Sequence, residues 1–254
     1  MTKIILNGCM GKLGSAILAI AQNSKDCEVV GGVDITGSGN GMTFPTYSNL
    51  DYCDRDADVV VDCSVVEAIP SLLKFGARRQ IPLVICTTGL PPEMVEAVKA
   101  VSEKVAVLQS ANMSLGINLL VNMVQRAAKL LVDSQFDIEI IEKHHNQKVD
   151  APSGTALALA DAVNLALDNK MEYVYDRSKE RKKRMAKEIG IHAMRGGTIV
   201  GEHSVIFAGS DEVIEFNHQA LSKEVFAVGA LKAARFMHGK PPGLYTMQDI
   251  INAI

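Results

Sequence analysis

The sequence contains no tryptophan, and aromatic residues make up only 5% of it. It has no apolar run of the roughly 20 residues that a helix needs to cross a bilayer, and residues 1–7 show no signal-peptide pattern. A net charge of −3 gives no basic excess, and the short charged run at 177–187 is typical of a solvated helix or loop. We therefore expect a cytoplasmic protein that binds neither membranes nor nucleic acid.

Neither a disulfide framework nor a metal site is indicated. The five cysteines are odd in number and include no C-x-x-C pair, a pattern typical of reduced thiols. The six histidines have no ligand spacing, and the adjacent His144 and His145 would point to opposite faces of a strand. The sequence thus predicts no metal cofactor.

The first half of the chain alternates apolar runs with helical segments. The runs lie at residues 3–7, 28–33, 57–63 and 82–86, and one helical segment lies around 67–79. Such alternation predicts a parallel sheet with helices on its faces, as in a doubly wound Rossmann-type domain. At 254 residues, the chain can form one large or two modest domains.

A glycine-rich turn follows the first of these strands. Gly8, Gly11 and Gly14 have the spacing G-x-x-G-x-x-G, one residue off the usual dinucleotide-binding motif, and a helix follows them. Asp34 ends the second strand, where an acidic group is expected to hold ribose hydroxyls. The alternative is a plain glycine turn beside an ordinary strand-end aspartate. The candidate cofactor-binding residues here are Gly8, Cys9, Met10, Gly11, Lys12, Leu13 and Asp34.

Two later strands end in small polar residues, DCS at 62–64 and TTG at 87–89. Ligands of open parallel sheets lie outside the carboxyl ends of the strands. We therefore expect these residues to line the nicotinamide side of a cofactor cleft.

Chemically active side chains are concentrated at residues 142–156, EKHHNQKVDAPSGTA. Before them, residues 136–141 alternate apolar and acidic side chains, so a strand should carry His144 and His145 to a sheet edge. With Lys148, the two histidines would form a site for a small anionic substrate. The alternative interpretation is a polar loop with surface histidines.

The same stretch ends in a predicted helix start. Pro152 breaks regular structure, Ser153 is a suitable N-cap, and an Ala/Leu-rich run covers residues 155–167. A helix N-terminus offers unpaired N–H groups and a partial positive charge. Ser153, Gly154 and Thr155 are therefore candidates for gripping a carboxylate or phosphate.

The remaining segments predict further helices and strands. Residues 114–133 and 226–238 have helical spacing, whereas residues 191–207 and 212–218 alternate like antiparallel strands with one exposed face. Together with residues 136–141, these strands would form an open mixed sheet.

Residues 142–156 resemble the signature E-x-H-H-x-x-K-x-D-A-P-S-G-T-A of the 4-hydroxy-tetrahydrodipicolinate reductases, also called dihydrodipicolinate reductases. CTTG at 86–89 is similar to the family's G-T-T-G, with Cys86 in place of glycine, and ANMS at 111–114 is similar to its A-N-F/M-S. The family segment R-x-G-x-I-V-G-E-H is matched from Arg195 to His203. The proline that follows D-F-T in the family is absent, since Val65 and Val66 follow Ser64. The resemblance covers nearly the whole chain.

The resemblance implies a Rossmann-type doubly wound parallel sheet and a second α+β domain built on an open mixed sheet. Residues 1–112 and 223–254 would form a discontinuous dinucleotide-binding domain. Residues 113–222 would form the substrate-binding and oligomerisation domain, with its sheet as the interface of a homotetramer.

The resemblance also implies an activity, namely reduction of 4-hydroxy-tetrahydrodipicolinate to tetrahydrodipicolinate with NAD(P)H, in lysine and diaminopimelate biosynthesis. The substrate is a small dicarboxylate. His144 and Lys148 would be catalytic, and Arg195 would face the substrate, although a structural arginine at a subunit interface is an equal alternative. The other implied substrate-binding residues are His145, Ser153, Gly154 and Thr155. The further implied cofactor-binding residues are Cys86, Thr87, Thr88, Ser110, Ala111, Asn112 and Met113.

The second strand ends in Asp34-Ile35-Thr36, with no basic residue to pair with a 2′-phosphate. An aspartate here accepts hydrogen bonds from ribose hydroxyls and repels a phosphate dianion. We therefore expect a modest preference for NADH. NADPH remains an alternative, because Lys12, Ser38 and Asn40 are available to contact the phosphate.

Two other functions compete with this interpretation. A different nicotinamide enzyme on the same scaffold, such as an amino-acid dehydrogenase, would keep the first half without needing HHxxKxDAPSGTA. A non-catalytic NAD-binding regulator would keep the glycines and Asp34 but would not need His144 and Lys148.

Overall fold

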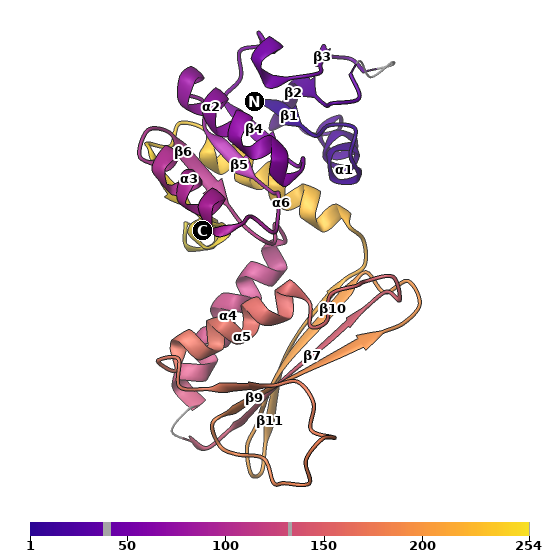
Figure 1. The fold of residues 1–254 in the computed structure, drawn as a ribbon, viewed down its shortest axis with the longest axis vertical. Coiled ribbons are helices and arrows are strands. Elements are labelled where there is room, and N and C mark those ends of the chain that lie inside the picture. Colours follow the sequence, from indigo (N-terminus) through magenta and orange to yellow (C-terminus); the bar gives the residue numbers. More distant parts are fainter. Residues whose placement is uncertain (38–41, 132–133, 254) are drawn as a thin grey trace. The chain divides into compact units, whose positions relative to one another are not determined.

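The computed structural model describes residues 1–37, 42–131 and 134–253 (Figure 1). Ser38, Asn40 and Asp133, which entered the sequence predictions, lie outside these ranges. The chain forms two compact units, one of Met1–Leu115 with Lys223–Ile254 and one of Gly116–Ser222. Within the described ranges, no helix has the length and apolar character needed to span a membrane.

The first unit contains a seven-stranded sheet in which every strand pair is parallel, in the order β12-β6-β5-β4-β1-β2-β3. The predicted doubly wound Rossmann-type sheet is thereby confirmed. Its strands are β1 (Thr2–Asn7), β2 (Cys27–Val33), β3 (Thr46–Tyr47), β4 (Val59–Asp62), β5 (Leu83–Ile85), β6 (Ala106–Gln109) and β12 (Gly243–Tyr245). Its helices are α1 (Lys12–Ala21), α2 (Ile69–Arg79), α3 (Pro92–Ser102), α6 (Glu224–Met237) and α7 (Met247–Asn252), with short 3-10 turns at Leu50–Tyr52 and Val66–Ala68.

Both faces of this sheet are buried, which explains why its strands are continuous apolar runs. Ile4 and Leu6 of β1 belong to one core cluster with residues of α1 and α6. Ile5, on the opposite face, belongs to a second cluster with residues of α2 and α3. The sequence predictions assigned no element to residues 92–109, where α3 and β6 are found.

The second unit is built on a five-stranded mixed sheet in the order β11-β10-β7-β9-β8. The strands are β7 (Asp137–His144), β8 (Glu172–Val174), β9 (Glu188–Arg195), β10 (Gly201–Ala208) and β11 (Val213–Ala220). The helices are α4 (Leu115–Leu131) and α5 (Gly154–Ala166), and both contribute to one hydrophobic cluster with β7, β9 and β10 (Figure 1). The open mixed sheet was thus predicted correctly.

The expectation for residues 191–207 was wrong in one respect. They form two strands that do not pair with each other, because β7 lies between β9 and β10. β9 runs parallel to both β7 and β8, whereas β10 is antiparallel to β7 and β11. Alternation fixes which side chains face the core but not the direction of the neighbouring strand.

The charged run at residues 177–187 is a loop in which every residue except Arg184 is exposed, as its composition predicted. Arg177 binds Glu188 at 2.5 Å and Glu139 at 2.7 Å, and Arg184 binds Asp137 at 2.6 Å and Glu139 at 3.1 Å. These ion pairs hold the run against the ends of β7 and β9.

Candidate active site

The turn between β1 and α1 excludes side chains at two of its glycines. Gly8 has φ +78°, and a Cβ there would lie 2.7 Å from the carbonyl oxygen of Cys63. A Cβ on Gly14 would overlap the Gly8 carbonyl oxygen. Gly11 caps α1 without a side-chain hydrogen bond, so the helix N-terminus presents its N–H groups to the turn. Such a cradle fits the pyrophosphate of a dinucleotide.

A cavity of about 470 Å³ adjoins this turn and is lined by Gly8, Met10, Gly11 and Asp34, among other residues. The Asp34 carboxylate accepts hydrogen bonds from the Met10 N–H at 3.0 Å and from the N–H and hydroxyl of Thr36 at 3.1 and 2.8 Å. Burial raises the pKa of Asp34, but these hydrogen bonds outweigh it and leave the pKa below its usual value. The cavity therefore holds a charged acceptor suited to ribose hydroxyls.

Three other predicted cofactor-binding residues of this turn do not line the cavity. The Cys9 side chain is fully buried in the core, against Gly32 of β2. Lys12 and Leu13 lie in the first turn of α1. Their contribution to an anion site comes from the backbone of the helix N-terminus.

The polar strand ends are tied together by the buried carboxylate of Asp62. It accepts hydrogen bonds from Asn7 Nδ2 at 2.7 Å, Ser64 Oγ at 2.5 Å and Thr87 Oγ1 at 2.6 Å. Burial raises the pKa of the Asp62 carboxyl, and the three hydrogen bonds oppose this shift. The carboxyl ends of β1, β4 and β5 thus form one rigid edge.

Among the other predicted cofactor-binding residues, Thr88 is exposed and Cys86 is buried, and burial raises the pKa of the Cys86 thiol well above its usual value. In the loop after β6, Ser110 Oγ donates to the Asn112 carbonyl at 2.9 Å. Ala111 is exposed in this loop, whereas Met113 is buried in the core.

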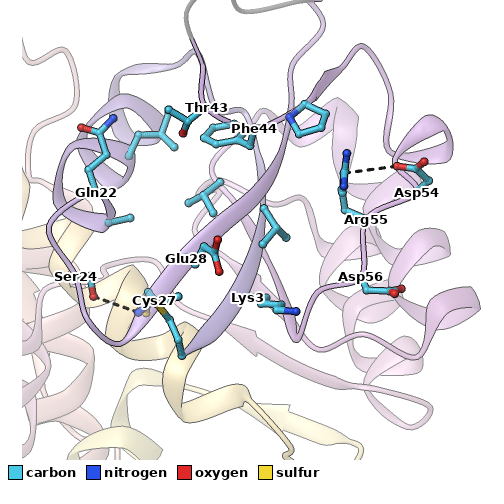
Figure 2. A pocket seen from close by; sticks show the side chains of 16 residues that line it. Lys3, Gln22, Ser24, Cys27, Glu28, Thr43, Phe44, Asp54, Arg55 and Asp56 are labelled. Atoms are coloured by element: carbon cyan, nitrogen blue, oxygen red, sulfur yellow. Dashed lines mark hydrogen bonds and ion pairs between the residues drawn. The ribbon is translucent and has the colours of Figure 1, made fainter.

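Another cavity, of about 920 Å³, lies beside β2 in the first unit and contains none of the predicted site residues. Figure 2 shows Glu28 near the middle of the lining, Gln22 on one side, and Arg55 beside Asp54 on the other. Charges of both signs line it, so its lining favours no single class of ligand.

In the second unit, the inner face of β7 changes from apolar to polar along the strand. Ile138 and Ile140 are buried in the core, and the next two residues on this face, Glu142 and His144, are buried as well. Opposite Glu142 lies His203 of β10, and opposite His144 lies Arg195 of β9. The strand register therefore assembles a polar site directly beyond the core.

Glu142 is the centre of this site. Its carboxylate is fully buried and accepts hydrogen bonds from His144 Nδ1 at 2.6 Å and from the Ser153 N–H at 2.9 Å. Arg195 donates to both carboxylate oxygens, at 2.7 Å each. Burial raises the pKa of Glu142, but the hydrogen bonds from Arg195, His144 and Ser153 outweigh it, so the pKa lies below its usual value.

Arg195 also donates to the carbonyl oxygens of Met194 at 2.8 Å and Asp150 at 2.6 Å. The two terminal nitrogens of Arg195 therefore already bind groups of the protein. This is the arrangement of a structural arginine, the alternative considered from the sequence. Sequence reasoning missed Glu142, although its spacing of two from His144 on one strand places both side chains on the same face.

Lys148 and His145 lie in the turn after β7. Lys148 Nζ is 2.8 Å from Asp150 Oδ1, and the hydrogen bond from Lys148 lowers the pKa of Asp150. The Asp150 carboxylate also accepts from the Gly154 N–H. His145 is half-buried, and its Nδ1 atom is buried without a hydrogen-bond partner among the described residues.

Ser153 is the N-cap of α5, as predicted, since its Oγ accepts from the Ala156 N–H at 3.2 Å. Its Oγ is also 3.1 Å from His203 Nε2, so both polar groups of Ser153 bind the protein. Gly154, by contrast, has no atom within 4 Å of where a Cβ would stand. The approach to the helix N-terminus is therefore open at Gly154. In the part of the chain that the structure describes, no cluster of His, Cys, Asp and Glu is arranged to hold a metal ion.

His203 is a second residue that sequence reasoning did not select. Its ring is only 4% exposed and lies edge-on to the His144 ring, with 5.1 Å between centroids. Burial, reinforced by the neighbouring His144, lowers the pKa of His203 to about 4. Because a histidine is buried in its neutral form here, its protonation opposes folding.

This shift predicts a pH dependence of stability. The pKa of His203 is about 4 in the folded chain and about 6.5 in the unfolded chain, so the unfolded state binds more protons between these values. The contribution of neutral His203 to the free energy of unfolding is complete above about pH 6.5. It is lost as the pH falls towards 4, and the loss reaches about 3 kcal/mol. Urea unfolding of wild-type protein and His203→Gln at pH 7 and pH 4.5 measures it. The loss on acidification should be smaller in the variant, and equal losses would contradict the assignment.

Comparison with protein families gives two matches. The family model described as "Dihydrodipicolinate reductase, N-terminus" matches residues 2–113, and the one described as "Dihydrodipicolinate reductase, C-terminus" matches residues 116–251. The two matches therefore span both units.

Individual relatives agree with the family models. The chain is 53% identical to the 4-hydroxy-tetrahydrodipicolinate reductase of Caldanaerobacter subterraneus subsp. tengcongensis, over 99% of this chain and 98% of that protein. It is 47% identical to the enzyme of the same name from Clostridium tetani, over 100% and 98%. Its fold is similar to that of a dipicolinate-bound dihydrodipicolinate reductase from Paenisporosarcina sp. TG-14, with a TM-score of 0.82 at 21% identity, covering 98% and 99% of the two chains. The chain belongs to the dihydrodipicolinate reductase family.

Proposed function

We propose that this chain is an NAD(P)H-dependent oxidoreductase that reduces 4-hydroxy-tetrahydrodipicolinate to tetrahydrodipicolinate, a step in lysine and diaminopimelate biosynthesis. Relatives that match over the full length carry the name of this activity. The observation that carries the proposal is the position of His144, which is hydrogen-bonded to a buried carboxylate and followed by Lys148 and the open N-terminus of α5.

The first unit fits the cofactor. Its glycine turn leaves room for a pyrophosphate, and the Asp34 carboxylate is charged and faces the adjoining cavity. When bound, a reduced nicotinamide supplies a hydride. We infer that the turn from Gly8 to Leu13 and Asp34 hold its adenosine half, and that the strand ends hold its other half through Cys86, Thr87, Thr88, Ser110, Ala111, Asn112 and Met113.

The second unit fits a small dicarboxylate, the class of ligand named for the Paenisporosarcina enzyme. A substrate carboxylate would take the place of the Asp150 carboxylate on Lys148 and on the Gly154 N–H, because both donors suit an anion. His145 and Thr155 would complete the binding site. Ser153 and Arg195 would support it from behind through Glu142.

The reaction requires a proton as well as a hydride, and it releases water. We infer that His144 and Lys148 act as the general acids of this site. A proton from either neutralises the negative charge that the hydride brings to the substrate. Their position beside the proposed anion site supports this assignment.

The direct test uses purified protein, enzymatically generated substrate and either cofactor, with loss of nicotinamide absorbance as the readout. Consumption that depends on the substrate is expected. Absence of consumption with both cofactors, together with oxidation of an amino acid with NAD⁺, would favour the rival dehydrogenase. Cofactor binding with neither reaction would favour a regulator.

We propose that NADH is the preferred cofactor. Ile35, which follows Asp34 and lines the same cavity, is 90% exposed and offers no charge to a 2′-phosphate. A missing ion pair at such a site corresponds to about 5- to 30-fold in kcat/KM. Ile35→Arg should raise kcat/KM for NADPH, whereas Ile35→Gln, of similar length but uncharged, should not. A clearly higher kcat/KM with NADPH in the wild-type protein would overturn the preference.

The assembly and location are further proposals. We infer a cytoplasmic homotetramer that associates through the sheet of the second unit, whose edge strand β11 has alternating exposed residues. Light scattering coupled to size-exclusion chromatography tests this, with four chains per particle as the expected result.

A further inference from the structure

We propose that Glu142 and Arg195 act as a positioning pair that fixes the tautomer and orientation of His144, so that its Nε2 atom exchanges the proton with the substrate. The inference rests on the proposed function for the identity of the substrate. The arrangement of the three side chains stands independently of it.

The hydrogen bonds of Glu142 determine which nitrogen of the His144 ring carries the proton. Oε2 receives His144 Nδ1 at 2.6 Å and Arg195 Nη1 at 2.7 Å, and Oε1 receives Arg195 Nη2 at 2.7 Å and the Ser153 N–H at 2.9 Å. Both oxygens thus already accept from obligate donors. A carboxylate can only accept, so Nδ1 must carry the proton, and Nε2 is the atom left to exchange a proton with the substrate.

Arg195 keeps the carboxylate in place. Its bidentate contact fixes the plane of the carboxylate, and its bonds to the carbonyl oxygens of Met194 and Asp150 fix the guanidinium in turn. A lysine has no planar fork and would not replace it. Arg195 therefore acts on His144 through Glu142 and needs no contact with the substrate.

The ring is also held by its neighbours. His203 lies edge-on against it, and a Cβ on Gly201 would stand only 3.2 Å from His144 Nε2, so glycine leaves this side of Nε2 clear. Among the described residues, the titratable groups in contact with the ring are Glu142 on β7 and His203 on β10, and Arg195 on β9 binds the same carboxylate. Lys148 in the loop before α5 and His218 on β11 act electrostatically on His203.

The proton step follows from this geometry. In the imidazolium form, the Nε2–H bond breaks as the proton passes to the substrate atom on which negative charge develops. The ring is left neutral, with Nδ1–H still donated to Glu142, and Glu142 remains ionised throughout. Solvent returns a proton to Nε2 before the next turnover.

Glu142→Gln preserves the shape of the side chain and removes its charge. We expect kcat to fall about 10- to 100-fold with little change in KM, because the imidazolium loses its charged partner. The limb of the kcat profile that reports His144 should move to lower pH for the same reason. Arg195→Lys should lower kcat in the same direction.

Glu139 offers a matched control on the same strand. Its carboxylate binds His192 at 2.8 Å and also binds Arg184 and Arg177, but its odd position puts it on the opposite face of β7 from Glu142. Glu139→Gln removes an equivalent carboxylate and should leave the kcat profile unchanged. Equal profiles for the two variants would overturn the proposal.

A measurement on the wild-type protein tests the proposal even if the variants fail to fold. The ¹⁵N spectrum of its histidines, with His144 assigned from the spectrum of His144→Gln, reports which ring nitrogen carries the proton. We expect protonated Nδ1 and unprotonated Nε2 in the neutral ring, and the reverse would overturn the pair. This readout needs no turnover, so absence of reductase activity would count against the proposed function and leave the tautomer result standing.

Discussion

Replacing both His144 and Lys148 by alanine will lower kcat about 10²- to 10⁴-fold if these residues supply the proton, which is the usual range for loss of general acid catalysis. The two side chains lie where β7 ends and α5 begins, beside an open helix N-terminus. Steady-state kinetics with saturating cofactor measure the effect. Circular dichroism of the variant confirms that it is folded.

A variant at Thr155, a proposed binding residue, provides the comparison. Thr155→Val removes a hydroxyl at the start of α5 and should mostly raise KM, since it acts on the bound substrate and the transition state alike. Wild-type kcat in the folded double variant would refute the catalytic assignment. A kcat loss at Thr155 as large as in the double variant would reverse the two roles.

Gly229→Ala should destabilise the first unit by about 2–4 kcal/mol. Gly229 lies in α6, and a Cβ there would overlap the carbonyl oxygen of Met113, which is backbone and cannot rotate away. The helix and the segment Ser110–Met113 must therefore move apart. The free energy of unfolding in urea and the KM for the cofactor are both expected to report the change.

The neighbouring position provides the control. Val228 is on the same helix but is 40% exposed, so Val228→Ala should change the free energy of unfolding by less than about 0.5 kcal/mol. An effect of Gly229→Ala as small as this would mean that the contact with Met113 relaxes at no cost.

The first unit was predictable because its strands are buried on both faces. Its turn also contains positions that only glycine can occupy. β1, β2 and β4 are continuous apolar runs, and such runs stand out from their surroundings. β3 has two residues and β12 has three, and elements of this length carry little pattern of their own. The order of the strands was not predicted, because it depends on contacts between distant segments.

The position of the candidate site in the sequence was predictable, but the hydrogen bonds among its side chains were not. The helix start at Ser153 and the strand that ends in His144 follow from local pattern. The contact of Glu142 with Arg195 joins residues 53 positions apart, and it depends on β9 lying beside β7 rather than beside β10. The alternation of apolar and polar residues cannot reveal strand order. The role of Glu142 and the hydrogen bonds that occupy the Arg195 guanidinium were therefore apparent only in the structure.

The return of the chain to the first unit has a consequence for its synthesis. Residues from α6 and α7, including Ala230, Met237 and Ile250, fill the same core cluster as Ile4 and Leu6 of β1, and β12 extends the sheet beside β6. Because a ribosome releases the N-terminus first, that face of the sheet is covered only in part, by α1, until Lys223–Ile254 has emerged, whereas Gly116–Ser222 is continuous and is complete earlier. We therefore expect the second unit to finish folding before the first, whose apolar side chains remain exposed to aggregation during that interval.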